Sequence, residues 1–497
     1  DAVSGKTGYS VNISGSETGK VILNNQIDGA GTITISGTKV LLQADHLLNG
    51  SGLVLKGGEL RFDNGSSDSN IILVSLTGGN GIIHFDVDTF QGKADTINVE
   101  DLFGTVKVVA HNIEPPVTKN SDSVAEKDLI KFAEVARHNE GLFEILRVEG
   151  SAYSWRAQSQ TRDNGATDWF MQIVSDADKR PIITAETVAY LGLNSAALEQ
   201  TRSVVRNVES KLAANMVLYN CCGGFYDRYY SGTPLINLWA APVYNSVKIR
   251  KPTDFDADIY GLEAGADVQA DPYNRYGIFA SYRRGRYDFS GKTAWLNSLV
   301  SSDINIDSYL GGLYYRYSYG NFWAMGTIFG GIQQADIKTA DGIKTNTDAV
   351  EFGARISSGK AYNLRPGFTV EPGLSASYTQ IAYDKIRDDY GKEARFGNTA
   401  EIELEAGVKF EKSLLSDFEY NKIYFKPSLV QTIALDDKVK ITGLNSSETL
   451  KDRTLGRIEA GFTANLNDKW SAFGSAGYTF GNGYQDTSIN IGINYAF

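Results

Sequence analysis

The sequence has few of the residues that build disulfide-rich or metal-binding proteins. Its 497 residues include two cysteines, Cys221 and Cys222, and four histidines. Adjacent cysteines cannot supply the two spaced pairs of a structural zinc site, and no histidine belongs to a paired pattern such as His-Glu-x-x-His. We therefore expect no metal or other cofactor. Two free thiols are expected, with a strained vicinal disulfide as the alternative.

Long apolar runs and an excess of positive charge are also absent. No run of 18 apolar residues occurs, which excludes a transmembrane helix but not a membrane barrel, whose strands alternate in polarity. The formal net charge is -11, whereas nucleic-acid binding needs a basic face for the phosphates. No nucleic-acid partner is therefore expected.

The motifs of common hydrolases and nucleotide-driven enzymes are missing as well. There is no Gly-x-Ser-x-Gly elbow, no Gly-Asp-Ser-Gly segment and no Gly-x-x-x-x-Gly-Lys-Ser/Thr loop. We expect no enzymatic activity in this portion. The chain begins at Asp1 without Met or a charged-then-apolar leader, which predicts a processed or truncated form that lacks its signal peptide and further N-terminal sequence.

Glycine and aromatic residues are abundant instead. The chain has 51 glycines, 27 tyrosines and 23 phenylalanines but only 10 prolines. This mixture favours many strands joined by tight turns, and the length predicts more than one unit. We expect an all-β chain with one helical segment, divided into residues 1–94, 95–178, 179–230 and 231–497.

The first two of these segments have the pattern of a structural repeat followed by a cap. Gly-x-Gly followed by strand residues begins at Gly29, Gly50 and Gly79, with starts 21 and then 29 residues apart. Such a period is typical of β-solenoid rungs, and an unrelated β-meander is the alternative. Residues 95–178 keep strand character with more aromatic and charged residues, as suits a cap over the last open rung.

Residues 185–191 and 195–219 change to a helical period. Leu198, Val205 and Val208 recur at helical spacing, and Ser195 suits an N-cap. About 25 helical residues span about 37 Å, more than the roughly 25 Å apolar band of an outer-membrane barrel. The segment is too rich in charge to face lipid, so we expect it to thread the lumen of a barrel.

From residue 231 onward, amphipathic strands recur. Regular alternation marks 260–268, 350–356, 368–378, 402–410 and 458–466, and weaker candidates lie near 236, 277, 309, 323, 424, 471 and 489. The total of twelve is even, which places both barrel ends on one membrane side. The last nine residues alternate strictly and end on an aromatic residue, as suits the closing strand of such a barrel.

Charged residues of both signs lie on the face opposite the apolar one. They are Glu263, Glu351, Arg355, Glu371, Glu403, Glu405, Lys409, Arg457 and Glu459. A hydrated lumen can pair such charges while lipid meets the apolar face. The alternative is a soluble barrel or double sandwich, which would show comparable alternation.

This order of elements resembles the monomeric autotransporters, the type V secretion proteins of Gram-negative outer membranes. The similar segments are Ala152-Tyr153-Ser154-Trp155, Asp168-Trp169-Phe170, Gly261–Asp267 with Tyr276–Ala280, Pro372-Gly373-Leu374, Pro427-Ser428-Leu429 and the terminal Phe497. The resemblance implies a right-handed parallel β-helix passenger at 1–94 and an autochaperone cap at 95–178. It further implies a pore-threading helix and a 12-stranded transmembrane barrel.

The resemblance also implies a function and partners. The barrel would anchor and export its own passenger, an adhesin or virulence-related domain, to the cell surface. The partners would be outer-membrane lipid, periplasmic chaperones, an unknown host or cell-surface ligand, and the barrel-assembly machinery, which would recognise Ile493, Tyr495 and Phe497. A diffusion porin with an appended extracellular β-domain is the alternative, and the predicted lumen helix disfavours it.

Some family members cleave themselves in the pore helix by asparagine cyclisation beside an acidic residue. Asn207 and Asn215 are the candidates by position, with Glu209 nearby, although the Asn-Asn pair of that subgroup is missing. Otherwise both are ordinary polar residues that line a wet lumen.

Overall fold

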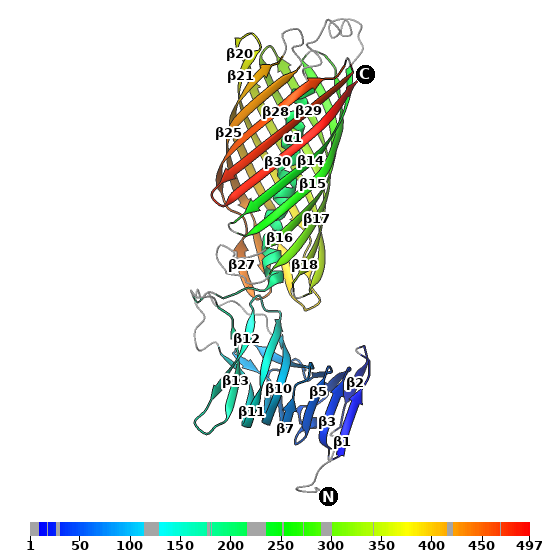
Figure 1. The fold of residues 1–497 in the computed structure, drawn as a ribbon, viewed down its shortest axis with the longest axis vertical. Helices are drawn as coiled ribbons and strands as arrows, with labels where there is room; N and C mark the ends of the chain where they lie inside the picture. The colour runs from blue at the N-terminus through cyan, green and yellow to red at the C-terminus, as the bar shows by residue number, and fades with distance from the viewer. Residues whose placement is uncertain are drawn as a thin grey trace. The chain divides into compact units, whose positions relative to one another are not determined.

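The chain forms two units in the computed structural model (Figure 1). The first comprises residues 1–184 with 389–393 and 441–445, and the second comprises 185–388, 394–440 and 446–497. The structure describes residues 9–16, 18–25, 30–113, 129–175, 179, 181–215, 235–250, 253–271, 273–289, 301–340, 342–414, 421–467 and 469–497. The predicted segments 1–94 and 95–178 both fall in the first unit.

The first unit is built on parallel strands. They are β1 (Tyr9–Ser14), β2 (Lys20–Leu23), β3 (Ala30–Ser36), β4 (Lys39–Leu42), β5 (Gly52–Lys56), β6 (Glu59–Arg61), β7 (Asn70–Thr77), β8 (Ile82–Asp88) and β10 (Thr96–Asn112), with a short 3-10 helix η1 (Asp45–Leu48) and the short strand β9 (Lys93–Ala94). The order β1-β3-β5-β7-β10-β8-β6-β4-β2 is parallel at every step. Odd-numbered and even-numbered strands therefore form two stacks.

The long strand β10 joins the two stacks. Its residues 96–103 pair with β7, and its residues 107–112 pair with β8. The predicted repeat is corrected in one respect: the Gly50 segment leads into β5, but the Gly79 segment leads into β8, in the other stack. The sequence motif marked corners of both stacks, because a tight corner needs the same backbone freedom in each.

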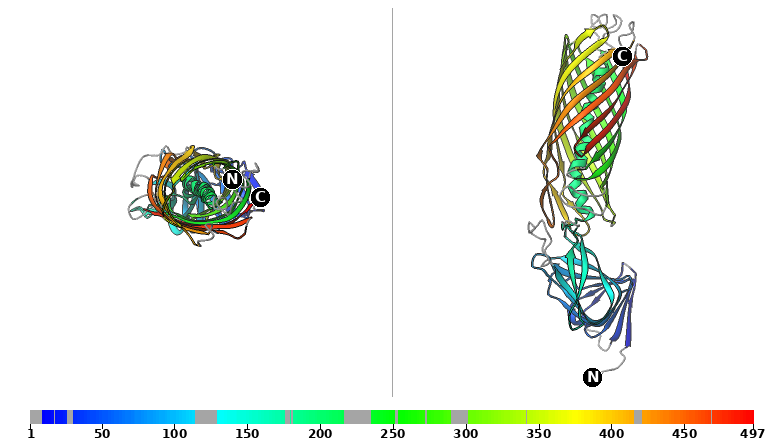
Figure 2. Two further views of the ribbon diagram at one scale, coloured as in Figure 1. Left: turned by 90° about the horizontal axis from the view of Figure 1, so that it is seen from above. Right: turned by 60° about the vertical axis from the view of Figure 1, so that its left-hand side comes forward.

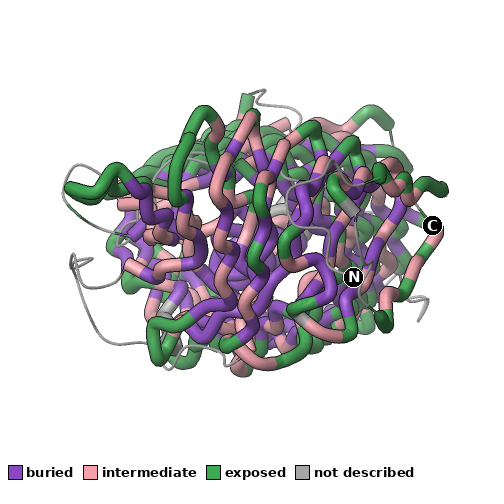
Figure 3. The backbone as a smooth tube through the Cα atoms, turned by 90° about the horizontal axis from the view of Figure 1, so that it is seen from below, coloured by how far each residue is buried: buried purple, intermediate pink, exposed green. Residues whose placement is uncertain are grey.

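Apolar ladders across the stacks make the core of the first unit. One ladder joins Ile33, Leu53, Leu76 and Leu102 through strand register, and each of these side chains is at most 1% exposed. Parallel pairing brings such residues into line on one face. In Figure 3, which colours the backbone of the whole chain by burial, exposed segments are most frequent at the edge of the view.

Three strands from the predicted cap complete the first unit. β11 (Ile130–Glu149) pairs with β10 in parallel, β13 (Thr167–Ile173) pairs with β11 antiparallel, and β12 (Trp155–Thr161) pairs with β13. Phe132 of β11 stacks on Phe85 of β8 with ring centroids 5.6 Å apart, and Trp169 packs edge-on against Phe143 at 5.4 Å. Residues 95–178 thus share one core with the stacks.

In the described part of the second unit, twelve antiparallel strands close into a barrel, whose ring of strands is visible in Figures 1 and 2. They are β14 (Leu235–Ile249), β15 (Phe255–Gln269), β16 (Asn274–Phe289), β17 (Ser302–Tyr319), β18 (Phe322–Thr339), β19 (Lys344–Lys360), β21 (Phe368–Tyr383), β24 (Thr399–Ser413), β25 (Lys422–Asp436), β28 (Arg453–Asn465), β29 (Trp470–Gly481) and β30 (Tyr484–Ala496). The pairings β14–β30 and β19–β21 complete the ring. The predicted twelve-stranded barrel is confirmed.

Shorter strands lie in the connections of the barrel. They are β20 (Tyr362–Arg365), which pairs with β21, and β22 (Ile386–Arg387), β23 (Glu393–Phe396), β26 (Lys438–Ile441) and β27 (Leu444–Glu448), which form a small sheet.

The barrel is apolar outside and polar inside. Ile328, Ile356 and Leu374 are each more than half exposed on the outer face, whereas Glu263 and Arg283 on the inner face are fully buried. A soluble barrel would place its apolar face inward, so the arrangement is the one that lipid requires. The soluble-barrel alternative is therefore not supported by the fold.

The helix α1 (Ala185–Asn215) runs inside the ring of strands, as the end-on view in Figure 2 shows. Its 31 residues span about 46 Å. The predicted interruption between residues 191 and 195 is wrong: the helix is continuous, and a Cβ on Gly192 would lie 2.0 Å from Cε1 of Phe289. Gly192 serves close packing rather than a helix break.

Residues 216–219 of the predicted helix, and both cysteines, lie outside the described residues. Among the described residues, no helix has both the length and the hydropathy needed to span a membrane.

Candidate functional site

The candidate site is the polar interior of the barrel, where side chains of α1 meet side chains of the strands. At the first turns of the helix, the Tyr190 hydroxyl donates to Asp388 Oδ2 at 3.2 Å, and Asn194 Nδ2 donates to Thr449 Oγ1 at 3.3 Å. These contacts join the helix to connections that follow β21 and β25. The helix is therefore held to the barrel from its first turns onward.

An ion-pair cluster anchors the next part of the helix. The Arg202 guanidinium donates to both carboxylate oxygens of Glu401, at 2.6 and 2.7 Å, and also pairs with Glu199 on its own helix. The Tyr484 hydroxyl donates to Glu199 Oε2 at 2.9 Å. Only 7% of the Arg202 side chain is exposed. Bidentate, desolvated pairs of this kind set the rotation and depth of a helix more than they add net stability.

Glu351 meets the middle of the helix through neutral partners. Its carboxylate accepts hydrogen bonds from Ser308 Oγ at 2.8 Å, from Gln333 Nε2 at 3.0 Å, and from the Thr201 hydroxyl of α1. Among the described residues, no cation lies within ion-pair distance of Glu351. Its contact with the helix is thus a hydrogen-bond network rather than a salt bridge.

A fully buried triad holds the helix near its last described side chains. Lys211 of α1 and Arg283 of β16 both pair with Glu263 of β15, and all three side chains are at most 1% exposed. Asn207 Nδ2 donates to Glu263 Oε1 at 3.5 Å, and the Lys211 ammonium lies 4.5 Å from the centre of the Trp239 ring. Buried charges of this kind are tolerated only when they are paired, as these are.

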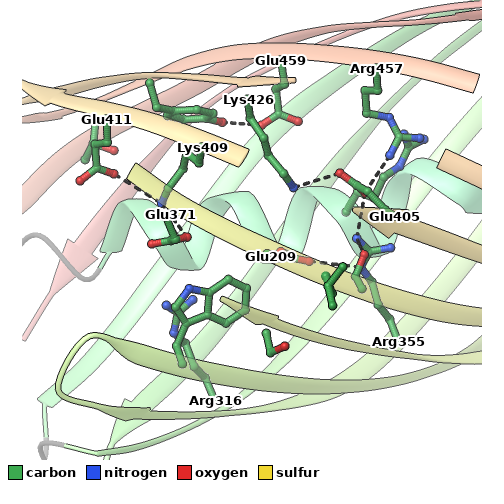
Figure 4. A pocket seen from close by; sticks show the side chains of 18 of the residues that line it. Glu209, Arg316, Arg355, Glu371, Glu405, Lys409, Glu411, Lys426, Arg457 and Glu459 are labelled. Carbon is green, nitrogen blue, oxygen red and sulfur yellow. Dashed lines mark hydrogen bonds and ion pairs between the residues drawn. The ribbon is translucent and has the colours of Figure 1, made fainter. Parts of the chain in front are cut away.

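A larger network continues along the opposite wall (Figure 4). Glu209 of α1 accepts from Arg355 Nε at 3.1 Å, and Arg355 Nη2 in turn lies 3.3 Å from Glu405 Oε2. Arg457 Nη1 and Lys426 Nζ approach Glu405 at 2.9 and 3.0 Å. Three cations therefore share one buried carboxylate, and the helix enters the network through Glu209.

The nine charged residues that the sequence assigned to the inner face are placed as follows. Glu263, Glu351 and Arg355 contact α1 directly, and Glu403 lies 3.8 Å from Arg202. The others line a cavity beside the helix: Glu371, Glu405, Lys409, Arg457 and Glu459. The sequence did not single out Glu199, Arg202 and Lys211 of α1 as the partners of inner-face charges. Its signal for them was only that a helix with so many charged side chains does not suit lipid.

The proposed assembly and cleavage residues occupy distinct places. Ile493 and Phe497 are about half exposed on the outer face, and the Tyr495 ring lies 4.7 Å from the rings of Trp470 and Phe497. The Phe497 N–H donates to the Ile236 carbonyl at 2.9 Å, which continues the β14–β30 seam. Asn207 lies beside Glu263, whereas the side chain of Asn215 is outside the described residues.

A polar cluster in the first unit lies on the outer face of its even-numbered stack. His84 Nδ1 and His111 Nε2 are 3.0 Å apart, and His111 Nδ1 lies 2.7 Å from Glu149 Oε2. Burial, with the nearby Arg61 guanidinium and His111, lowers the pKa of His84 to about 3. In the part of the chain that the structure describes, no group of three or more metal-ligating side chains could hold an ion.

Comparisons with known proteins bear on both units. Residues 238–477 match the family model described as the autotransporter beta-domain. The Escherichia coli (strain K12) protein YdeU, described as uncharacterised, is 23% identical over 479 residues, which cover 87% of this chain and 99% of YdeU.

Two further similarities cover about half of the chain. The esterase EstA of Pseudomonas aeruginosa is 21% identical over 258 residues, or 48% of this chain and 38% of the esterase. The transport unit of the autotransporter AIDA-I from Escherichia coli matches 53% of this chain and 90% of that unit, with 16% identity and a TM-score of 0.45.

The family match coincides with the barrel strands from β14 to β29. Autotransporter β-domains are barrels of the Gram-negative outer membrane, and the apolar outer face and charged inner face of this barrel agree with that setting. Residues 238–477, which form most of the barrel, belong to the autotransporter beta-domain family.

Proposed function

We propose that this autotransporter exports its first unit to the cell surface and then keeps it anchored there. The observation that carries the proposal is α1, which connects the first unit to β14 through the barrel interior and is fixed there by Arg202, Glu209 and Lys211. A chain that has passed through the barrel leaves such a connecting segment in the lumen. The paired charges then hold that segment in one position.

Folding of the first unit outside the cell would draw the chain outward. We propose that the two parallel stacks are a β-helix passenger and that β10 to β13 act as its autochaperone cap. Each strand added to a stack buries a residue against a neighbour already in place, as Leu76 packs between Leu53 and Leu102. Export by this route needs no nucleotide hydrolysis in the chain itself.

Protease treatment of intact cells tests the topology. Loss of the first unit, with survival of a heat-modifiable C-terminal fragment that begins near Ala185, is the expected result. Protection of both units would overturn surface display. The adhesin or virulence role of the first unit, toward an unidentified host or cell-surface ligand, is a separate part of the proposal and requires binding assays with the purified first unit.

Assembly of the barrel is assigned to its last strand. We expect the assembly machinery to recognise the outward residues Ile493, Tyr495 and Phe497, and periplasmic chaperones to keep the chain unfolded beforehand. Deletion of Phe497 should lower the heat-modifiable barrel in outer membranes, because it removes an exposed aromatic side chain and the backbone bond to Ile236. An unchanged yield in the Phe497 deletion would contradict this assignment.

We also propose that neither unit is an enzyme. The esterase EstA is similar to this chain over only 38% of its own length, so its activity is not carried over to this chain. Purified protein should not hydrolyse a short-chain p-nitrophenyl ester above the level of a heat-inactivated sample, and saturable hydrolysis would refute this part.

A diffusion porin is the second candidate, and the seated helix disfavours it. Planar-bilayer conductance separates the two: a plugged barrel should conduct poorly until α1 is deleted. A high conductance of the intact chain would favour the porin.

Self-cleavage at Asn207 is a further proposal that rests on its contact with Glu263. Attack of Nδ2 on the Asn207 carbonyl carbon would close a succinimide and break the bond to the Val208 nitrogen. Glu263 would accept the Nδ2 proton, and the Val208 nitrogen would gain one as it leaves. Intact mass after outer-membrane purification should then show two fragments, whereas an unbroken chain would end the proposal. Asn215, whose side chain lies outside the described residues, is the alternative position.

A further inference from the structure

The barrel interior contains a cavity at the end of the lumen that carries Phe497. It offers about 80 Å³ to water-sized molecules, room for several of them. Nineteen residues line it, among them Arg206 and Glu209 of α1. Seven of the lining residues are cationic and five are acidic, so the wall carries an excess of positive charge.

Cations on this wall have carboxylate partners, with one exception. Lys409 pairs with Glu371 at 3.2 Å, and Lys422 pairs with Glu411 at 2.7 Å. Arg355, Arg457 and Lys426 share Glu405, as described above. Figure 4 shows the contacts of Lys409 with Glu371 and of Lys426 with Glu405 as dashed lines, and no dashed line leads to Arg316.

Arg316 is the exception among the described residues. Only 5% of this residue is exposed, and its guanidinium makes a single hydrogen bond, from Nε to Ser318 Oγ at 3.4 Å. No carboxylate of the described residues lies within ion-pair distance of it, although Glu209 and Glu371 line the same cavity. The residue directly opposite on β16 is Arg275, a second guanidinium, which is already paired with Asp267 at 2.6 Å. A buried cation beside another cation is unfavourable unless an anion neutralises it.

The position of the guanidinium leaves its donors available. Arg316 Cζ lies 4.4 Å from the centre of the Trp323 ring, and a guanidinium stacked in this way keeps the N–H groups in its plane free. Trp323 lines the same cavity, and its indole N–H is buried without a hydrogen-bond partner. Two side chains on one wall therefore present unused donors.

We propose that this cavity is a binding site for a small oxyanion, phosphate or carboxylate, with Arg316 as its principal ligand. Guanidinium groups bind such anions through two parallel hydrogen bonds. The ligand is a free ion rather than a lipid headgroup, because the site is on the inner face of the barrel. Its function would be to neutralise this end of the lumen while the helix is seated. This inference is independent of export and of the nature of the first unit.

Calorimetric titration of the folded, full-length protein in detergent with inorganic phosphate, at constant ionic strength, tests the proposal. The wild type should bind phosphate saturably at one site, and Arg316→Gln should weaken the Kd at least tenfold. Arg284→Gln is the matched control, because Arg284 is an exposed guanidinium on the outer face of β16, and it should leave the Kd unchanged. Acetate in place of phosphate distinguishes a carboxylate site from a phosphate site.

Heat-modifiability of each variant confirms that its barrel is folded. If Arg316→Gln folds poorly, Arg316→Lys is the second variant: because it retains the charge, it should bind phosphate more weakly than the wild type but still measurably. Phosphatidylglycerol added before the titration should not weaken phosphate binding, and competition by this lipid would assign the site to a lipid headgroup and overturn the proposal. Equal binding of both oxyanions by the wild type and Arg316→Gln, or binding that never saturates, would also overturn it.

Discussion

The two units of this chain use opposite interiors. The first unit fills its core with aliphatic and aromatic ladders, such as the one from Ile33 to Leu102, and keeps its few buried ionisable groups, such as His84 and Asp95, outside these ladders. The barrel fills its interior with charges, such as Glu263, Arg283 and Glu405, and places isoleucine and leucine outside. Because water surrounds one unit and lipid the other, the same alternating strand pattern is satisfied in opposite directions.

This contrast predicts opposite responses to comparable substitutions. In the first unit, stability should depend on the volume of buried apolar side chains. In the second unit, it should depend on whether buried charges keep their partners. The predictions below test the contrast, from the largest expected effect to the smallest.

Loss of a buried cation in the barrel should have the largest effect. Arg202→Met leaves Glu401 and Glu199 without their shared partner, which should cost about 3–5 kcal/mol in the seating of α1. Bilayer recordings should show increased conductance as the helix leaves the lumen. Arg284→Met, at an exposed position, should conduct like the wild type, and an equal increase in both variants would contradict the role of the Arg202 cluster.

Loss of buried apolar volume in the first unit should come next. Leu55 is 0% exposed, and Leu55→Ala should lower the free energy of unfolding of the first unit by about 2–5 kcal/mol. A denaturant titration, with protease sensitivity of the first unit as the readout, measures this free energy. The matched substitution in the barrel, Ile356→Ala at a 65% exposed outer position, should change barrel stability in detergent by less than about 0.5 kcal/mol. Similar losses at both sites would end the contrast.

The pH response of the first unit should be moderate and should depend on His84. Its pKa of about 3 in the folded unit lies below its ordinary value of 6.5, so the unfolded chain binds the proton first. This contribution to stability is complete above about pH 6.5 and is lost as the pH falls toward 3. Asp95, whose pKa burial raises to about 7, acts in the opposite direction between about pH 4 and 7.

His84→Gln should therefore flatten the loss of stability between pH 6.5 and 4.5 relative to the wild type, as measured by denaturant midpoints. His138→Gln, at an exposed position, is the control and should follow the wild type. A His84→Gln profile identical to that of the wild type would show that His84 does not carry the effect.

Glu351→Gln should have the smallest effect. Among the described residues the carboxylate accepts from neutral donors, Thr201, Ser308 and Gln333, so an amide of the same shape breaks no ion pair there. We expect a change below about 1 kcal/mol in helix seating, with conductance like the wild type. A large increase in conductance would mean that Glu351 holds the helix as a charge.

Much of the fold could be predicted from single segments of sequence. All twelve barrel strands were predicted near their observed positions, because alternation between Ile402 and Phe410, for example, is a local property. The helix was predicted with a false break at Gly192, because local rules assign glycine a cost in a helix and cannot show that Phe289 occupies the space of its missing side chain.

The stacks of the first unit and the partners in the lumen were harder to predict. The motif at Gly79 looked equivalent to that at Gly50, yet pairing placed the two in different stacks. Likewise, the charge of Arg202 was visible in the sequence, but its partner Glu401 lies 199 residues away. Such pairings arise from long-range register, which no local pattern encodes.

The sequence by itself determined the strand count, the polarity of each barrel face and the presence of a helix too charged for lipid, because these follow from the order of neighbouring side chains. Only the tertiary structure decided which charges meet. Ring closure and helix rotation bring Lys211, Lys409 and Arg457 to carboxylates, whereas Arg316 meets none among the described residues. The carboxylate of Glu371, which lines the same cavity as Arg316, is paired with Lys409 instead.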